Sequence, residues 1–515
     1  MKIHAASVVL MAAVLAGCTA PRFEPPAPLP VRSALPPQPD DAFVSIESAL
    51  LDAHGAGTSG FELLDRNEDG LRWRLALLDS ARHSIDAQYY LWYGDASGLL
   101  MVRRLLDAAD RGVKVRLLLD DINALLRDAG TIKLRDQGIA LLESHPNIEI
   151  RLFNPWSRRG LAGRADEALR DMKRLNQRMH HKQLIVDNRA AIIGGRNIGD
   201  EYLGLSDKFN FHDLDVLGVG PVARMASAVF DTFWNSDWVM PASAIVAEVT
   251  AAAAERAGAD MMARLTTEES LQGFALEPQD WTREIEALAR RLHAGTGELL
   301  TDVPAAGGIA HEMRQAINAL ASSAQRELLI VNAYIIPVDE TIERMRDLGS
   351  RGVRIRILTN SLASHDVPAV NSHYKQRRLD ILAAGAELYE VRPDAAIQAL
   401  VSDTPPVRAR FMGLHSKAMV IDGERAYIGS MNFDPRSAAI NTEMGVAIES
   451  AGLADELARL IERDMEPANS WQLRLNDAGK VIWVSDEETL DRQPARSWWQ
   501  RVQDAFFMLF PKDLY

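Results

Sequence analysis

The chain contains an internal repeat in which a strand, a helix and a second strand follow one another twice. Alternating apolar residues predict the strands, and apolar residues at helical spacing predict the helices. The first copy covers residues 84–90, 98–110 and 111–120, and the second covers 327–334, 339–348 and 351–360. Strands joined by a helical crossover pair in parallel, so each copy is predicted to be an α/β sandwich. We therefore expect two copies of one domain.

Each half also carries the same polar motif. The first half has His180-His181-Lys182, then Asp187, then Gly194-Gly195-Arg196-Asn197. The second half has His415-Ser416-Lys417, then Asp422, then Gly429-Ser430-Met431-Asn432. The interval from His to Asn is seventeen residues in both copies. One short motif would be weak evidence, but two copies with identical spacing in a duplicated chain are specific.

The spacing indicates the chemistry of the site. A His and a Lys two residues apart on a strand point to the same face, and a glycine turn can bring an Asn back to the same edge. If the two halves meet face to face, two imidazoles, two ammonium groups and two amides surround one pocket. Such a pocket suits a phosphodiester, with cations and amides for the phosphoryl oxygens and imidazoles as nucleophile and acid.

The repeated His-x-Lys-x-x-x-x-Asp resembles the HKD motif of the phospholipase D superfamily. Residues 86–90, 108–112, 151–155, 175–180 and 194–202 look like bacterial cardiolipin synthases of the C type. The resemblance implies an α/β fold of duplicated α/β/α sandwich domains, related by a pseudo-twofold axis, with the active site at their interface. It further implies a phosphohistidine intermediate, with His180 as nucleophile and His415 as acid. The two copies are too alike for the sequence to decide that order.

The resemblance also implies roles for the other motif residues. The positions that match substrate-binding residues are Lys182, Lys417, Asn197, Asn432, Ser430 and Gly195. Asp187 and Asp422 complete the two motifs and are interpreted as structural partners at their far ends. A downstream carboxylate orients each imidazole in the family, and Glu443 after His415 and Asp215 after His180 match it, with Asp213 as the alternative to Asp215. We expect neither metal nor cofactor, because the lysines supply the positive charge.

The N-terminus resembles that of a bacterial lipoprotein. Residues 1–17 have the short polar start and apolar run of an export signal, and Leu15-Ala16-Gly17-Cys18 resembles a lipobox, which implies acylation of Cys18. An ordinary signal peptide is the alternative. Residues 18–42 are rich in proline and are predicted to be a tether. Thr19 in place of Asp resembles an outer-membrane address facing the periplasm. Cys18 is the single cysteine, which excludes disulfides and cysteine zinc sites.

The remaining segments complete the domain plan. We expect a first domain at 43–240, a helical connector at 241–305, a second domain at 306–470, and a hairpin with an amphipathic tail at 471–515. For the tail, contact with a membrane and docking on the protein's own core are both open. His365 and His373 fall in what is predicted to be a solvated loop, with contact to the substrate as the alternative.

Composition narrows the function. The formal net charge of -14 and pI near 5.4 argue against a nucleic-acid partner, whose binding depends on Lys and Arg. The favoured function is a membrane-tethered phosphatidyltransferase that makes cardiolipin from phosphatidylglycerol and a second phospholipid. A phospholipase D-type hydrolase is the alternative, a superfamily nuclease is disfavoured, and an inert scaffold is the remaining possibility. One chain holds both motifs, so a monomer should be active.

Overall fold

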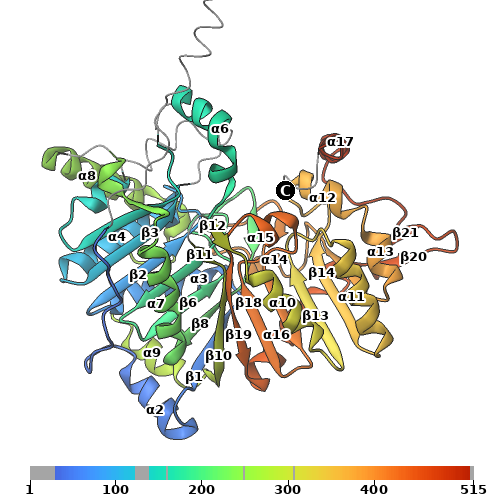
Figure 1. The fold of residues 1–515 in the computed structure, drawn as a ribbon, viewed down its shortest axis with the longest axis horizontal. Coiled ribbons are helices and arrows are strands. Elements are labelled where there is room, and N and C mark those ends of the chain that lie inside the picture. The colour runs from blue at the N-terminus through green and yellow to red at the C-terminus, as the bar shows by residue number, and fades with distance from the viewer. Residues whose placement is uncertain (1–28, 122–137, 158–160, 247–249, 306–307, 511–515) are drawn as a thin grey trace, which may run out of the picture.

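The computed structural model describes residues 29–121, 138–157, 161–246, 250–305 and 308–510 (Figure 1). Across these residues, one sheet of 18 strands runs through both halves of the chain. From the outer edge to the centre, the first half contributes β9 (Val239–Pro241), β4 (Ile148–Phe153), β3 (Lys114–Asp120), β2 (Ser84–Tyr89), β5 (Lys182–Val186), β6 (Ala190–Gly194), β8 (Asp215–Val219) and β1 (Ser59–Leu64).

The second half repeats this order outward from the centre. Its strands are β10 (His293–Thr301), β19 (Met444–Glu449), β18 (Arg425–Gly429), β17 (Lys417–Ile421), β13 (Glu327–Asn332), β14 (Arg354–Asn360), β15 (Glu387–Val391), β20 (Ser470–Leu475), β21 (Val481–Val484) and β22 (Thr489–Leu490). In each half three strands pair in parallel, β2 with β3 and β4, and β13 with β14 and β15. The predicted duplicated α/β fold is confirmed.

The two halves join at β1 and β10, which pair antiparallel at the centre of the sheet. Ser59 lies opposite Gly295 and Phe61 opposite His293. An antiparallel join between equivalent strands is what a pseudo-twofold relation requires. Since β10 lies inside residues 241–305, the prediction of a purely helical connector there is wrong. The strand forms because its two edges find partners in β1 and β19, which local sequence does not reveal.

Helices cover both faces of the sheet. The helices are α2 (Val44–His54), α3 (Asn67–Ser80), α4 (Ala96–Asp110), α6 (Leu161–Asn176), α7 (Pro221–Trp234), α8 (Ala251–Thr267), α9 (Thr282–Leu288), α10 (Met313–Ser322), α11 (Asp339–Ser350), α12 (Pro368–Tyr374), α13 (Arg378–Ala383), α14 (Gln398–Val401), α15 (Pro435–Ala439), α16 (Ala451–Asp464) and α17 (Trp498–Phe507). Helices α3 and α4 cover one face of the first half, and α10 and α11 cover the equivalent face of the second. Helices α7 and α16 share one inner core with strands of both halves.

Apolar side chains that point alternately to the two faces of a strand build these core layers. In β5, Leu184 and Val186 face the core with α3 and α4, and Ile185 faces the shared inner core. In β17, Val420 faces the same inner core and Met419 the outer core of the second half. The shared core holds the halves together, which positions the ends of β5 and β17 relative to each other.

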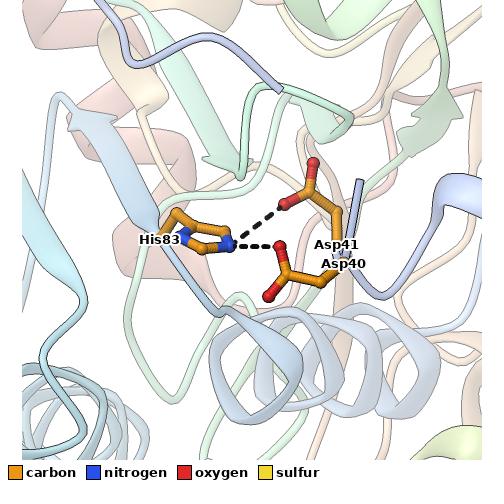
Figure 2. A group of neighbouring side chains, drawn as sticks. All are labelled: Asp40, Asp41 and His83. Atoms are coloured by element: carbon orange, nitrogen blue, oxygen red, sulfur yellow. Dashed lines mark hydrogen bonds and ion pairs between the residues drawn. The ribbon is translucent and has the colours of Figure 1, made fainter. Parts of the chain in front are cut away.

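Part of the predicted tether packs on the first half. The backbone N–H of Arg32 donates to Asn235 Oδ1 at 2.9 Å, and that of Ala34 donates to Asp231 Oδ2 at 2.8 Å. Further along, Asp40 and Asp41 meet His83 (Figure 2), whose Nε2 lies 2.8 Å from Asp40 Oδ1 and 3.8 Å from Asp41 Oδ1. Residues 32–41 therefore lie along the domain, so this part of the predicted tether at 18–42 packs on the protein.

The predictions for the two ends of the chain have different outcomes. Strands β20 and β21 confirm the hairpin after residue 470. The export signal and Cys18 lie outside the described residues. In the described ranges, the helices lack the combination of length and apolar character that crossing a bilayer requires.

Candidate active site

The two motif histidines are positioned by strands that cross between the halves. Two short strands, β7 (Asn210–His212) and β16 (Met412–Leu414), pair in parallel across the halves. Immediately after them, the His415 N–H donates to the His212 carbonyl at 2.7 Å. The His180 N–H makes the equivalent bond to the Thr442 carbonyl at 2.8 Å. Each histidine is thus fixed to the residue that precedes a carboxylate of the opposite half.

Each imidazole is held by that opposite carboxylate. His180 Nδ1 lies 2.8 Å from Glu443 Oε2, and His415 Nδ1 lies 2.5 Å from Asp213 Oδ2. All four side chains are buried. A carboxylate on Nδ1 leaves Nε2 as the atom that can attack or protonate. The expected pairing of each histidine with a carboxylate of its own half is therefore wrong, because the strands that precede the carboxylates cross over.

The expected residue Asp215 is also wrong, and Asp213 takes its role. Strand register gives the reason: Gly194 lies opposite Asp215 in the first half, and Gly429 opposite Gly445 in the second. Asp215 is therefore equivalent to Gly445, and Asp213, two residues earlier, is equivalent to Glu443. The Asp215 carboxylate instead forms buried ion pairs with Arg74 at 2.9 Å and Arg196 at 3.1 Å.

Gly195 and Ser430 contact the orienting carboxylates. The Ser430 hydroxyl donates to Glu443 Oε2 at 2.5 Å. At Gly195, a Cβ would lie 2.2 Å from Asp213 Oδ1, so only glycine leaves room for that carboxylate. Both residues therefore help to position the carboxylates, and their role as substrate ligands stays a prediction.

The motif lysines bring two buried cations to the site. Lys182 Nζ donates to the His180 carbonyl at 2.7 Å, and Lys417 Nζ donates to the His415 carbonyl. Burial lowers the pKa of Lys417 to about 8 and that of Lys182 well below its ordinary value. Since a buried ammonium is costly without a counter-charge, a phosphoryl group is the kind of anion that this pair stabilises.

The two asparagines differ. Asn197 Oδ1 accepts a hydrogen bond from the Leu91 N–H at 3.1 Å, which fixes the orientation of its amide. Asn432 is equally buried, but its Oδ1 has no hydrogen-bond partner within the described residues. Asn432 therefore keeps a free hydrogen-bonding group beside the site.

Asp187 and Asp422 lie at the opposite ends of β5 and β17 from the histidines. Asp187 Oδ1 accepts from the N–H groups of His83 at 2.8 Å and Ser84 at 2.9 Å. Asp422 Oδ1 accepts from the N–H of Arg326 at 2.7 Å, and that oxygen also accepts from the next residue. Both aspartates cap the start of a neighbouring strand. Their interpretation as structural partners agrees with these contacts, and neither is placed to react.

The two histidine–carboxylate pairs differ in charge. Burial lowers the pKa of His180 well below its ordinary value, and Lys182 and Lys417 lower it further. Burial also raises the pKa of Glu443 to about 8. For Asp213, burial would raise the pKa, but His415 lowers it below the ordinary value. The Asp213 carboxylate is thus anionic beside His415, whereas the His180–Glu443 pair shifts toward its neutral forms.

Aromatic side chains that the sequence did not indicate line the site. Tyr90 contacts His180 edge-on with ring centroids 4.7 Å apart, and Tyr202 contacts His415 at 5.2 Å. Tyr334 stacks on His365 at 5.1 Å and donates its hydroxyl to Asp366 at 2.7 Å. His365 is therefore buried beside the site, which corrects its expected place in a solvated loop. Tyr90 and Tyr202 fall within the segments 86–90 and 194–202 that resemble the family, but no local motif assigns these aromatic residues a place at the site.

His373 and His181 complete the histidines considered. His373 is 9% exposed, so it is not solvated either. His181 is buried with its ring 4.3 Å from the ring of Phe233 in α7, on the inner face of the sheet. Neither joins the pair formed by His180 and His415.

Known proteins resemble the chain over most of its length. A family model described as "Cardiolipin synthase, PLD-like domain" matches it twice, at residues 75–234 and 317–465. Cardiolipin synthase C of Escherichia coli strain K12 is 37% identical over 442 residues, covering 83% of this chain and 89% of that protein. Cardiolipin synthase of Geobacillus kaustophilus strain HTA426 is 24% identical over 453 residues, covering 87% and 74%.

Among solved structures, phosphatidylserine synthase of Haemophilus influenzae Rd KW20 has the same fold. The TM-score is 0.55 at 15% identity, over 80% of this chain and 87% of that one. Each of the two segments matched by the family model contains one motif with Asn seventeen residues after its histidine, so the duplicated fold and the paired motif coincide.

Proposed function

The chain belongs to the phospholipase D superfamily, with the PLD-like domain of cardiolipin synthases in both halves, and from this we propose that it transfers a phosphatidyl group through a phosphohistidine. The chain is a phosphatidyltransferase of that superfamily that acts on phospholipids. One observation carries the finer proposal: two buried imidazoles, each with Nδ1 against a carboxylate of the other half, beside two buried lysines.

In the first step His180 Nε2 attacks the phosphorus of a bound phospholipid. The N–P bond forms, the bond from phosphorus to the headgroup oxygen breaks, and His415 gives its proton to that oxygen. The assignment follows the two pairs: burial lowers the pKa of both imidazoles, that of His180 further, and the anionic Asp213 offsets part of this effect at His415, which makes His415 the better acid.

In the second step an acceptor alcohol replaces the headgroup. His415 takes the proton of the acceptor hydroxyl, the new P–O bond forms, and the N–P bond to His180 breaks. Lys182 and Lys417 hold the negative charge on the phosphoryl oxygens in both steps. With phosphatidylglycerol as acceptor, the product is cardiolipin, which is also the product named for the relative in Escherichia coli. With water as acceptor, the product is phosphatidic acid.

The test uses purified full-length protein and phosphatidylglycerol labelled in its phosphate. Cardiolipin should form with and without phosphatidylethanolamine. Quenching during turnover with detergent at alkaline pH should leave label on the protein, because the N–P bond of a phosphohistidine is stable in base and hydrolyses in acid. A variant that carries His180→Ala should retain no label, whereas His415→Ala should still accept it slowly. Phosphatidic acid as the sole product would favour the hydrolase, and label on His180→Ala but not on His415→Ala would reverse the order of the histidines.

We also propose that Cys18 anchors the chain to the outer membrane, facing the periplasm. The support is the lipobox-like sequence and Thr19. Metabolic labelling with a radioactive fatty acid should mark the parent chain and not Cys18→Ser. Absence of label on the parent would refute the anchor without touching the catalytic proposal.

A further inference from the structure

Helix α17 packs on the protein with its polar face. Asn371 Nδ2 and Lys375 Nζ both donate to the buried Asp504 carboxylate, each at 2.6 Å. Gln500 Nε2 donates to the Leu362 carbonyl at 2.5 Å. A surface helix ordinarily buries its apolar face, so this orientation is the reverse of the usual one.

The apolar face of α17 and the turn after it point to solvent. The exposed fractions of these side chains are 75% for Trp498, 58% for Trp499, 53% for Phe506, 47% for Met508 and 80% for Leu509. Their exposure is costly in water, and three of the five are aromatic residues of the kind enriched where a membrane meets water. The buried polar contacts of Asp504 and Gln500 hold the helix in this orientation, so the face is not a frayed end.

Arginines surround the base of the same helix. Arg492, Arg496 and Arg501 are exposed and line a cavity of about 480 Å³. Acidic residues also line the cavity: Asp394, Glu488 and Asp491. Within the described part of the chain, no carboxylate comes within ion-pair distance of these three arginines. Exposed apolar residues with unpaired cations just below them form the pattern of a helix that lies in the surface of an anionic bilayer.

A second helix has a similar exposed face. In α6, Leu169 is 88% exposed and Met172 is 56% exposed, and Arg170 and Lys173 are exposed beside them. Figure 1 shows α6 and α17 rising from the same edge of the molecule, at the top of the view. Both helices therefore carry exposed apolar and basic residues at the same edge of the molecule.

Both helices adjoin the active site, one on each side. The end of α6 leads to His180, and Arg436 of the second half binds Asn176 there, with Nη1 2.7 Å from Asn176 Oδ1. Helix α17 packs on the segment at 362–366, where His365 and Asp366 contact Tyr334 beside His415. Through these contacts the site is linked to α6 on the side of His180 and to α17 on the side of His415.

We propose that α6 and α17 form a docking face that seats the protein on an anionic phospholipid bilayer, with the mouth of the active site toward the lipid. The apolar side chains of this face enter the interface, and the arginines contact the lipid phosphates. The lipid substrate then reaches the catalytic histidines without leaving the bilayer surface. This inference rests on the proposed function, because it takes the substrate to be a membrane phospholipid.

The test compares one variant on two substrates. Full-length protein with Trp499→Ser, Phe506→Ser and Leu509→Ser should lose at least about tenfold in kcat/KM on phosphatidylglycerol vesicles, since the affinity of an interfacial helix scales with its buried apolar area. It should keep the parent rate on a short-chain phosphatidylglycerol below its micellar concentration. The matched control is Leu475→Ser, at a side chain 47% exposed on the β20–β21 hairpin, which should change neither rate. Equal losses on both substrates, or none on vesicles, would overturn the proposal.

A measurement of contact separates docking from catalysis. A polarity-sensitive dye at Leu509→Cys, in the full chain carrying Cys18→Ser, should shift to shorter wavelength when phosphatidylglycerol vesicles are added. The dye at Leu475→Cys should not shift. A shift at Leu509 without product from the vesicles or from the short-chain substrate would support the docking face and reject the proposed function. No shift with an active parent would reject the docking face alone.

Discussion

The two halves fill the same place beside the catalytic carboxylates in different ways. In the first half, Arg74 and Arg196 enclose Asp215 in a buried network of charges. Strand register places Met431 and Gly445 of the second half at the positions of Arg196 and Asp215. There, Met431, Ile317 and Met419 line an apolar cavity of about 200 Å³. Duplication has therefore preserved the reacting groups more strictly than the core behind them.

The carboxylates themselves show how the two copies compensate. Asp213, the shorter side chain, reaches its histidine beside Gly195, where no Cβ takes up space. Glu443, the longer one, reaches its histidine beside Ser430, which donates a hydrogen bond to it. A change in side-chain length is matched by a change in the neighbouring residue, so both imidazoles receive an oxygen at hydrogen-bond distance.

The largest effect is expected at the histidines, where the halves are functionally equal. His180→Ala and His415→Ala should each lower kcat on short-chain phosphatidylglycerol by at least about a hundredfold, since nucleophile and acid act as a unit. Circular dichroism and the melting temperature should match those of the parent. Activity of either variant within about tenfold of the parent would break the two-histidine mechanism.

The next effect sharpens the contrast between the buried networks. Asp215→Asn leaves two buried guanidinium groups without their counter-charge and should lower the free energy of unfolding by about 3–5 kcal/mol. Met431→Leu, at the position equivalent to Arg196, should change it by less than about 1.5 kcal/mol. Urea unfolding followed by fluorescence measures both. Similar losses would mean that the two regions are not as different as their contacts indicate.

The charge asymmetry of the carboxylates predicts a pH dependence. Burial raises the pKa of Glu443 to about 8. Below that pH the His180–Glu443 pair holds two protons, one on the Glu443 carboxyl and one on Nε2 of the neutral His180 ring. Loss of one proton frees Nε2, and kcat/KM on a short-chain substrate should therefore rise with pH through about 8. Glu443→Gln should remove this rise. Asp213→Asn should lower the rate but keep the rise, because the pKa of Asp213 is lowered and lies far from this range.

A larger side chain in the core should stabilise the protein when it is placed in the second half and destabilise it when it is placed in the first. Ala321→Leu places additional methyl groups in the cavity of the second half and should stabilise the protein by about 1 kcal/mol, since each buried methylene contributes about 0.8 kcal/mol. Ala76→Leu in α3, where the side chain is fully buried, should destabilise it by about 1–3 kcal/mol through overpacking. The melting temperatures of the two variants show whether only the core of the second half can accept a larger side chain.

The smallest effect is expected from chelation. Excess EDTA should leave the rate on short-chain substrate unchanged, because each half supplies one lysine to the phosphoryl oxygens. Loss of activity that a divalent ion restores would contradict this. The group of Asp40, Asp41 and His83 lies at the start of β2, whereas the histidine pair lies at the opposite end of the neighbouring β5. Binding of a metal ion to this group would therefore take place away from the catalytic histidines.

The sequence by itself determined the duplication, the family and the residues that carry the chemistry. Strand periodicity and the equal interval from His to Asn are local properties of the sequence. They can be recognised without knowing which segments lie close together in the fold. The spacing could not show that β10 is a strand, because that strand exists through its pairing with β1 and β19.

Only the tertiary structure decided which carboxylate serves which histidine. The interval along the chain pairs His180 with a carboxylate of its own half. Instead, the pairing of β7 with β16 brings Asp213 to His415, and the bridge between Met179 and Thr442 brings Glu443 to His180. Strand register, and not sequence distance, separates Asp213 from Asp215. The outward face of α17 was decided in the same way, since the buried contacts of Asp504 and Gln500 with distant residues determine which side of that helix meets the solvent.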